Sequence, residues 1–297
     1  MATESSSYYV PEQSRLPIFA TIGIFLTAFG AANWVNGGSS YIFFAGALTI
    51  ATVLWFWFAT VIRENMQGLN SDQLKRSYVW GMGWFIFSEV MFFAAFFGAL
   101  YYIRTFSLPW LGGEGDRGSS NMLWEGFQNT WPLMVTPDQA VSGNAAKVLG
   151  PKGIIDPWHL PLLNTFLLLA SSVTVHIAHV FLKKNRRQAF NLWLGITILL
   201  GASFLFFQVE EYMEAYKHLG LTLESGIYGT TFFMLTGFHG AHVTLGTIML
   251  LIMLLRSVIA HHFKPNDHFG FEAASWYWHF VDVVWVGLFI FVYVLGA

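Results

Sequence analysis

The hydrophobic and polar positions of this chain form long apolar runs divided by shorter polar stretches. No Lys, Arg, Asp or Glu occurs between Arg15 and Arg63. A membrane-spanning helix needs about 20 apolar residues, so this run is long enough for two helices. The string NWVNGGSS at 33–40 lies in its middle and is typical of a turn. The pattern therefore predicts a helical hairpin, with helices over 16–34 and 41–62.

Five further apolar runs follow the hairpin. We expect their helices over 77–104, 159–182, 189–209, 225–255 and 274–296. The connection at 105–158, rich in Gly, Pro, Asn and Asp, is expected to form a long external loop. The pattern thus predicts an all-α membrane protein of seven helices, with a two-helix hairpin at 16–62 and a five-helix bundle at 77–296.

The composition supports a membrane protein. Hydrophobic residues make up 55% of the 297 residues and charged residues 11%, whereas soluble domains carry roughly 25% charged residues. The net charge of -2 does not favour a nucleic-acid partner, and the lack of Cys excludes disulfides and thiolate metal sites on this chain. The opening residues, MATESSSYYVPEQSRLP, are expected to form a short polar arm without a signal or transit peptide.

Basic residues predict the orientation, because cytoplasmic loops carry an excess of Lys and Arg. With the N-terminus inside, ten of the 15 Lys and Arg residues lie on inside loops and five on outside loops. The inside residues are Arg15, Arg63, Lys75, Arg76, Lys183, Lys184, Arg186, Arg187, Arg256 and Lys264, and the outside residues are Arg104, Arg117, Lys147, Lys152 and Lys217. We therefore predict a cytoplasmic N-terminus and a periplasmic C-terminus.

One carboxyl group, Glu89, lies in the third apolar run, within the aromatic string FIFSEVMFFAAFF. An ionisable group at a bilayer centre costs about 2.5–3.5 kcal/mol on insertion scales and by default indicates function. Desolvation should keep this carboxyl neutral. Two roles stay open at this point. Glu89 transfers protons, or it only buffers protons and supports packing through a hydrogen bond to a neighbouring helix.

Two histidines, His239 and His242, are three residues apart in the sixth run and therefore share a helix face. A haem or metal site is one interpretation, and it needs a further ligand from another helix, such as His176 or His179. Hydrogen bonding between helices or contact with lipid head groups is the favoured interpretation, because no complete ligand set is evident.

His279 and Asp282 repeat this spacing in the seventh run. We expect a hydrogen-bonded pair, in preference to a carboxylate that orients a metal ligand. The preceding loop carries further histidines beside two carboxylates, and such a group can collect protons near neutral pH. Its residues are His261, His262, Asp267, His268 and Glu272.

Several strings identify a family. They are VIRENMQG, FSEVMFFAAFF, LPLLNTFLLLASSVTVHIAH, YGTTFFMLTGFHGAHV and HFGFEAASWYWHFVDVVW. They cover nearly every apolar run, and on these residues the chain resembles subunit III of the cytochrome c oxidases. The related subunit of the quinol oxidases has five helices and lacks the first hairpin, so the expected hairpin at 16–62 favours the cytochrome c form.

The resemblance implies a subunit of a proton-translocating oxidase of aerobic respiration, without a catalytic residue, redox cofactor or metal of its own. Haem and copper would reside on partner subunits I and II, and cytochrome c would be an indirect partner. Helices 1–2 and 3–7 would enclose a V-shaped cleft filled with phospholipid. Glu89 corresponds to the buried glutamate of the family. The implied lipid-binding residues are Arg63, Glu64, His242, Arg256 and His261.

The resemblance also implies that the chain stabilises subunit I, supports proton uptake and protects the oxidase during turnover. The connection at 105–158 is longer than expected of mitochondrial members, which favours a bacterial inner membrane over a mitochondrial one. Two other hypotheses follow from the residues alone. In the first, Glu89 and the histidines form the relay of a proton-coupled transporter. In the second, the chain is a bis-histidine membrane cytochrome.

Overall fold

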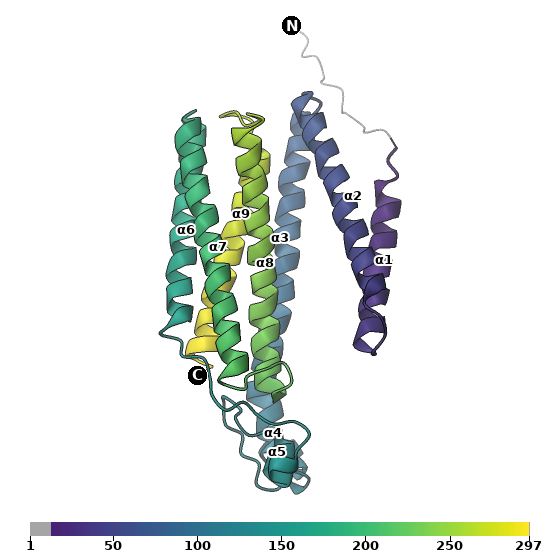
Figure 1. The fold of residues 1–297 in the computed structure, drawn as a ribbon, viewed down its shortest axis with the longest axis vertical. Coiled ribbons are helices and arrows are strands. Elements are labelled where there is room, and N and C mark those ends of the chain that lie inside the picture. The colour runs from purple at the N-terminus through teal and green to yellow at the C-terminus, as the bar shows by residue number, and fades with distance from the viewer. Residues whose placement is uncertain (1–12, 297) are drawn as a thin grey trace. The chain divides into compact units, whose positions relative to one another are not determined.

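The computed structural model describes residues 13–296, so residues 1–12 of the expected polar arm lie outside the described part of the chain. Within residues 13–296 the secondary structure is helical, apart from an isolated bridge between Lys264 and Asp267. Seven helices of this part are long and apolar enough to cross a membrane, which confirms the predicted number. The chain forms two compact units that divide inside one helix, between Met82 and Gly83 (Figure 1).

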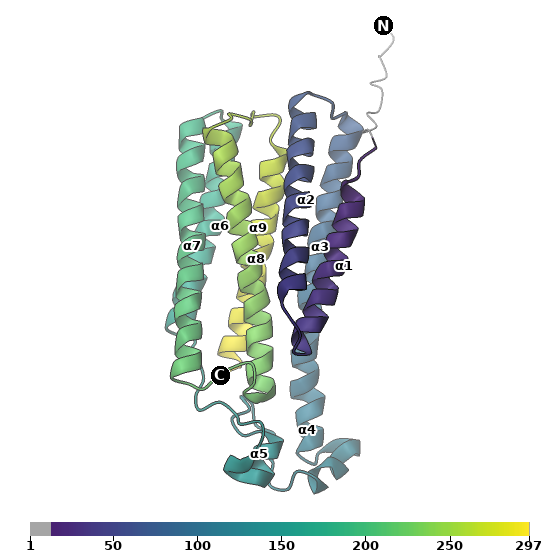
Figure 2. The same cartoon turned by 45° about the vertical axis from the view of Figure 1, so that its right-hand side comes forward.

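The first unit contains a closely packed helical hairpin. Helix α1 (Leu16–Val35) and helix α2 (Tyr41–Met66) run antiparallel, as Figure 2 shows. A Cβ atom on Gly30 would overlap the backbone of Phe43. Small residues at such positions let membrane helices approach each other closely. Van der Waals packing then stabilises the hairpin, because the hydrophobic effect does not drive helices together within lipid.

Helix α3 (Asp72–Tyr102) is longer than the predicted third helix. It continues through a π-helical turn, η1 (Ile103–Ser107), into the short helix α4 (Leu108–Leu111). The resulting apolar span of 40 residues begins and ends beyond the predicted 77–104. Charged residues mark where the apolar core of a membrane ends, but they do not interrupt the backbone hydrogen bonds of a helix, and this is why the prediction stopped short.

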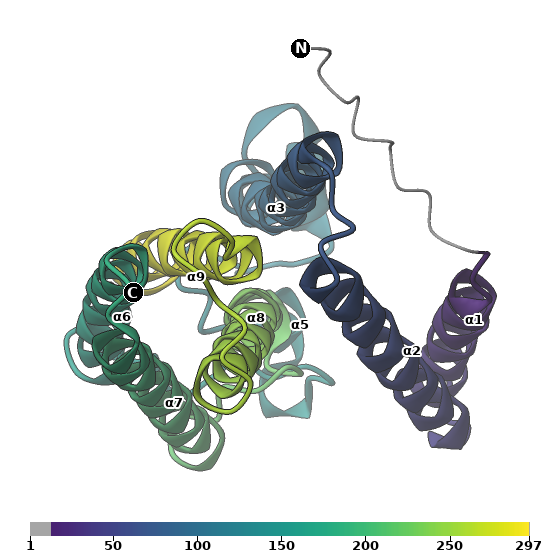
Figure 3. The same ribbon diagram turned by 90° about the horizontal axis from the view of Figure 1, so that it is seen from above.

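The second unit contains a ring of four helices (Figure 3). They are α6 (Leu160–Lys183), α7 (Arg187–Lys217), α8 (Gly226–Val258) and α9 (Phe269–Leu288). Each helix packs against its neighbours in the order α6, α7, α8, α9 and back to α6. Helix α9 ends in a π-helical segment, η4 (Phe289–Val294). Helix α7 runs past the predicted end at residue 209, for the same reason as α3.

The core of this ring is built around Trp278 of α9, which is fully buried. A Cβ atom on Gly201 would lie 2.6 Å from the Trp278 ring, and one on Gly246 would lie 2.8 Å from it. The indole Nε1 donates a hydrogen bond to Ser171 Oγ at 2.9 Å. Two glycines and one hydroxyl group thus let a large amphipathic ring join α6, α7, α8 and α9.

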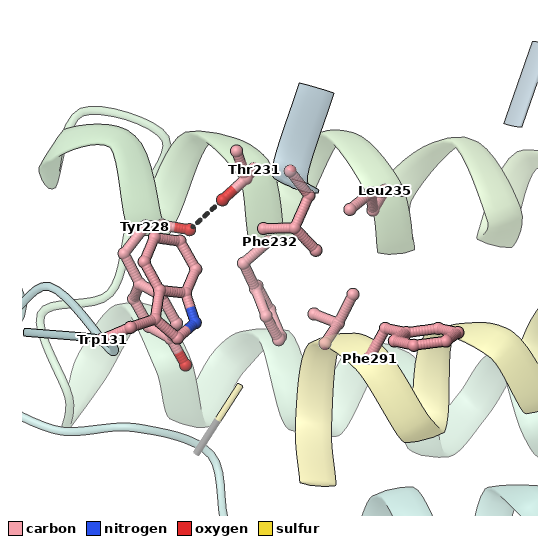
Figure 4. A pocket seen from close by; sticks show the side chains of 8 residues that line it. Trp131, Tyr228, Thr231, Phe232, Leu235 and Phe291 are labelled. Carbon is pink, nitrogen blue, oxygen red and sulfur yellow. Dashed lines mark hydrogen bonds between the residues drawn. The ribbon is translucent and has the colours of Figure 1, made fainter. Parts of the chain in front are cut away.

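The long connection lies beyond one end of the ring (Figure 2). It contains the 3-10 segments η2 (Gly115–Met122) and η3 (Gly143–Ala145) and the short helix α5 (Pro137–Ser142). Figure 4 shows how it is attached, with the Trp131 ring against Tyr228 at the start of α8. The apolar recess beside this contact leaves no room for a water molecule. The connection is therefore packed onto the bundle by aromatic side chains.

Candidate functional site

The buried carboxyl of α3 has a partner on α8. Glu89 Oε2 lies 2.9 Å from His242 Nε2. The Glu89 side chain is 22% exposed and the His242 side chain 13% exposed. Glu89 stands near the middle of its 40-residue span, so a bilayer would cover both groups. The structure therefore brings two ionisable side chains together at membrane depth.

The second ring nitrogen of His242 shows how many protons this pair holds. His242 Nδ1 lies 2.6 Å from the backbone oxygen of Phe238. A carbonyl oxygen only accepts, so Nδ1 must carry the hydrogen and donate it. A neutral His242 then turns a bare Nε2 toward Glu89, and a carboxylate and a bare nitrogen cannot bond to each other. One further proton therefore lies between Glu89 and His242.

Aromatic rings surround the imidazole. Its centroid lies 4.9 Å from the ring of Phe93, 5.8 Å from that of Phe92 and 6.3 Å from that of Tyr277. These rings exclude water from the pair, and desolvating two opposite charges has a cost that their attraction does not always repay. A neutral carboxylic acid beside a neutral imidazole and a carboxylate beside an imidazolium both place one proton in this contact, and they differ in which atom carries it.

His239 does not join this site, although it lies only three residues before His242. Its Nε2 donates a hydrogen bond to the Val281 backbone oxygen of α9 at 3.1 Å, and its ring lies against Trp285. The two histidines therefore contact different helices and do not converge on a common ligand. This geometry speaks against a haem or metal held by both, and it fits the expected hydrogen bonding between helices.

The expected hydrogen bond between His279 and Asp282 is wrong. His279 Nδ1 and Asp282 Oδ2 are 3.9 Å apart, which is too long for a hydrogen bond. His279 Nδ1 instead lies 2.7 Å from Ser172 Oγ on α6. Spacing along α9 brings the two residues to one side of the helix, but the hydroxyl group of the neighbouring helix offers the closer partner. Asp282 is buried, and neither of its carboxylate oxygens has a hydrogen-bond partner among the described residues.

Arg256 lies in the last turn of α8 and is partly buried. Within the second unit the guanidinium makes two weak contacts. Its Nη1 lies 3.7 Å from Met253 Sδ, and its central carbon lies 4.8 Å from the centre of the Phe263 ring. Its Nε atom is buried without a hydrogen-bond partner. A cation held in this way has donors left for an anionic group from outside the bundle.

The other residues implied to bind lipid differ in their contacts and exposure. Both ring nitrogens of His242 contact protein atoms, so neither is left to bond to a lipid head group. His261 is exposed, and its Nδ1 lies 2.8 Å from the Ser257 backbone oxygen. Arg63, which is exposed, and Glu64 lie in the last turn of α2, in the first unit.

The expected group of loop histidines does not form as a single cluster. His268 and Glu272 are joined by His179 of α6, which the sequence suggested only as a possible haem ligand.

A buried carboxyl of α7 was not predicted from the sequence. Glu211 is fully buried in α7 and accepts a hydrogen bond of 2.6 Å from the Tyr293 hydroxyl. The sequence assigned Glu211 to a loop because charge was taken as the end of the helix.

Comparisons with known proteins agree with this fold. The family Cytochrome c oxidase subunit III matches residues 6–113 and 127–297. Proteins named cytochrome c oxidase subunit 3 from Pongo abelii, Papio hamadryas and Latimeria chalumnae are 39%, 38% and 37% identical to this chain over 300, 300 and 298 residues. Each alignment covers 100% of this chain and 100% of the relative. The chain belongs to the cytochrome c oxidase subunit III family.

Proposed function

We propose that this chain acts as the non-redox subunit III of an aerobic terminal oxidase. Membership of the family makes it a subunit of cytochrome c oxidase. In this proposal haem and copper belong to partner subunits I and II, and cytochrome c delivers electrons to those subunits. This chain stabilises subunit I, holds a proton inside the membrane and binds phospholipid. The observation that carries the proton-handling role is the contact between Glu89 and His242.

The pair is suited to hold and release one proton. A carboxylic acid and an imidazole exchange a proton over 2.9 Å without moving heavy atoms, and both groups work in acid–base chemistry. The Phe238 carbonyl keeps the imidazole in the tautomer that accepts from Glu89. In this proposal the pair supplies protons toward subunit I during turnover, passing them at the bundle surface where the Glu89 side chain is 22% exposed and a partner subunit can contact it.

Proton uptake by the assembled oxidase tests this role. Glu89→Gln keeps the size of the side chain and removes its acidic proton, so steady proton uptake and the active lifetime of the oxidase should both fall. Glu211→Gln is the matched control, since it removes an equally polar carboxyl that is bonded to Tyr293 elsewhere in the same bundle. Unchanged uptake and lifetime in Glu89→Gln would reduce the carboxyl to a packing role.

Phospholipid binding is proposed for the helix ends that carry Arg256 and Arg63. Basic side chains at a membrane surface attract anionic head groups, and a guanidinium matches the geometry of a phosphate. The unpartnered Nε of Arg256 supports this role. Glu64 directly follows Arg63, and His261 lies five residues after Arg256 in the sequence. Arg256→Ala and Arg63→Ala should each lower the phospholipid retained by the purified oxidase. The same lipid content in both variants would remove this part of the proposal.

Two alternatives are tested by purifying the tagged chain from native membranes in mild detergent. Haem a bands and two larger partners support the cytochrome c oxidase. Haem b or o with quinol oxidation would identify a quinol oxidase, whose subunit lacks the hairpin formed here by α1 and α2. A chain that purifies without haem or partners and transports protons in vesicles would be a proton-coupled transporter.

We also propose a bacterial inner membrane with the N-terminus in the cytoplasm. The chain has no cysteine, so single cysteines report orientation without background. Asn144→Cys, in the long connection, should react with an impermeant thiol reagent added to the periplasmic side. Asn266→Cys, in the loop between α8 and α9, should react only after the membrane is opened. The reverse pattern would invert the orientation.

A further inference from the structure

Three ligand-type side chains meet at one end of the helix ring. His179 lies one turn before the end of α6, His268 immediately precedes α9, and Glu272 lies in the first turn of α9. These helix ends lie at the end of the ring opposite to α5, as Figures 1 and 2 both show. The cluster is separate from the Glu89–His242 pair, and the proposed function does not use it.

The three ligand atoms form a nearly equilateral triangle. His179 Nε2 and His268 Nε2 are 3.1 Å apart, and Glu272 Oε1 lies 3.3 Å from the first and 3.2 Å from the second. Zn²⁺ binds imidazole nitrogen and carboxylate oxygen at about 2.0–2.2 Å in tetrahedral geometry, which separates neighbouring ligand atoms by about 3.3 Å. The triangle therefore has the dimensions of one face of a zinc coordination tetrahedron.

A hydrogen bond prepares His268 for this role. Its Nδ1 lies 3.0 Å from the backbone oxygen of Lys264, so Nδ1 carries the hydrogen and Nε2 has a free lone pair. Metal-binding histidines are commonly held in this way by a backbone carbonyl. Without a cation, the bare Nε2 of His268 and the carboxylate of Glu272 would be two acceptors 3.2 Å apart. The arrangement needs either a proton or a metal ion between them.

The side chains are shielded, but the site is open on one side. The exposed fractions are 7% for His268, 18% for His179 and 28% for Glu272. Three protein ligands leave the fourth position of a tetrahedron for water or another group. Two nitrogen ligands favour a transition metal over Ca²⁺ or Mg²⁺, which prefer oxygen.

We propose that His179, His268 and Glu272 form a binding site for a divalent transition-metal ion, with Zn²⁺ as the best match. The ion joins the end of α6 to the start of α9, two segments that are 89 residues apart in the sequence at the His179–His268 contact. It requires no redox chemistry of this chain. Lys183, which interacts electrostatically with His179, weakens cation binding by repulsion.

Metal stoichiometry of the intact purified oxidase tests the site. The complex is first stripped with a chelator and then dialysed against chelator-buffered Zn²⁺, and the bound metal is measured by elemental mass spectrometry. The wild type should bind one more Zn²⁺ per complex than His268→Gln, with two imidazoles and one carboxylate in the X-ray absorption spectrum of that ion. Glu272→Gln should weaken this binding at least about tenfold, because losing even a supporting group of a metal site costs that much.

His176→Gln is the matched control, because His176 is an exposed histidine on the same helix outside the triangle. It should keep the wild-type stoichiometry, and Lys183→Gln should tighten binding. If His268→Gln fails to assemble, Glu272→Gln in the assembled complex carries the test, since Glu272 is the most exposed of the three. Equal Zn²⁺ binding in the wild type and Glu272→Gln would overturn the proposal and assign a shared proton to the cluster. So would a loss of equal size in His176→Gln.

Discussion

Glu89→Gln distinguishes a neutral pair from an ion pair at the contact between α3 and α8. In the neutral pair, Glu89 donates a hydrogen to His242 Nε2 over 2.9 Å. The amide of Gln has the same length and donates a hydrogen in the same direction. One neutral hydrogen bond replaces another, and because such bonds contribute about 0.5–1.5 kcal/mol each, stability should change by less than about 1 kcal/mol.

An ion pair gives a much larger effect. If His242 carries both protons and Glu89 is a carboxylate, the Gln variant removes the counter-charge of a buried imidazolium, which must then stay unpaired or release its proton. Removing one partner of a buried ion pair costs about 3–5 kcal/mol. Glu89→Ala supplies the reference for an unsatisfied His242 Nε2, with an expected loss of about 1–3 kcal/mol together with the cost of a cavity among the aromatic rings.

The assay is detergent-induced or thermal unfolding of the chain within the purified oxidase, for the wild type, Glu89→Gln and Glu89→Ala. Infrared difference spectroscopy adds a direct readout, because a protonated carboxyl has a carbonyl stretch that a carboxylate and the Gln variant lack. We expect Glu89→Gln to remain close to the wild type and the band to disappear. A loss of 3 kcal/mol or more in Glu89→Gln, with no such band in the wild type, would refute the neutral pair.

Two further predictions concern packing and pH. Gly201→Ala should destabilise the bundle by about 1–3 kcal/mol through overpacking, because its Cβ would lie 2.6 Å from the Trp278 ring. Gly195→Ala on the same helix is the control: its Cβ would meet nothing within 4 Å, so its thermal unfolding should match the wild type. Burial and the neighbouring Arg256 lower the pKa of His262 below its ordinary 6.5. As the pH decreases, the unfolded chain therefore takes up a proton near pH 6.5 before the folded chain does, and the free energy of unfolding falls. His262→Gln should lose part of this acid sensitivity when thermal unfolding is measured as a function of pH.

The number and order of the membrane helices could be predicted from sequence because a bilayer imposes a simple requirement. A helix must present about 20 apolar residues to lipid, and runs of that kind are visible without knowing any contact. The ends of α3 and α7 were predicted less well, since the backbone hydrogen bonds of a helix continue into water where the apolar run has stopped. The same error hid Glu211, whose surroundings exist only because α7 extends to Lys217.

The candidate site was predictable in its parts and not in its pairing. A lone Glu89 in an apolar run is unusual by composition alone, so sequence identifies it. Its partner His242 depends on which face of α8 meets α3, and His239, only three residues away, meets α9 instead. The failure of the expected His279–Asp282 bond has the same origin, because Ser172 belongs to another helix.

The sequence by itself thus determined the class of protein, the number of spans and the unusual carboxyl, because these follow from the cost of placing polar groups in lipid. The tertiary structure decided which polar groups contact one another. Those contacts join residues that are 153 positions apart for Glu89 and His242 and 89 apart for His179 and His268. A hydrogen bond depends on distances of a few tenths of an ångström, and only the packing of whole helices sets distances at that scale.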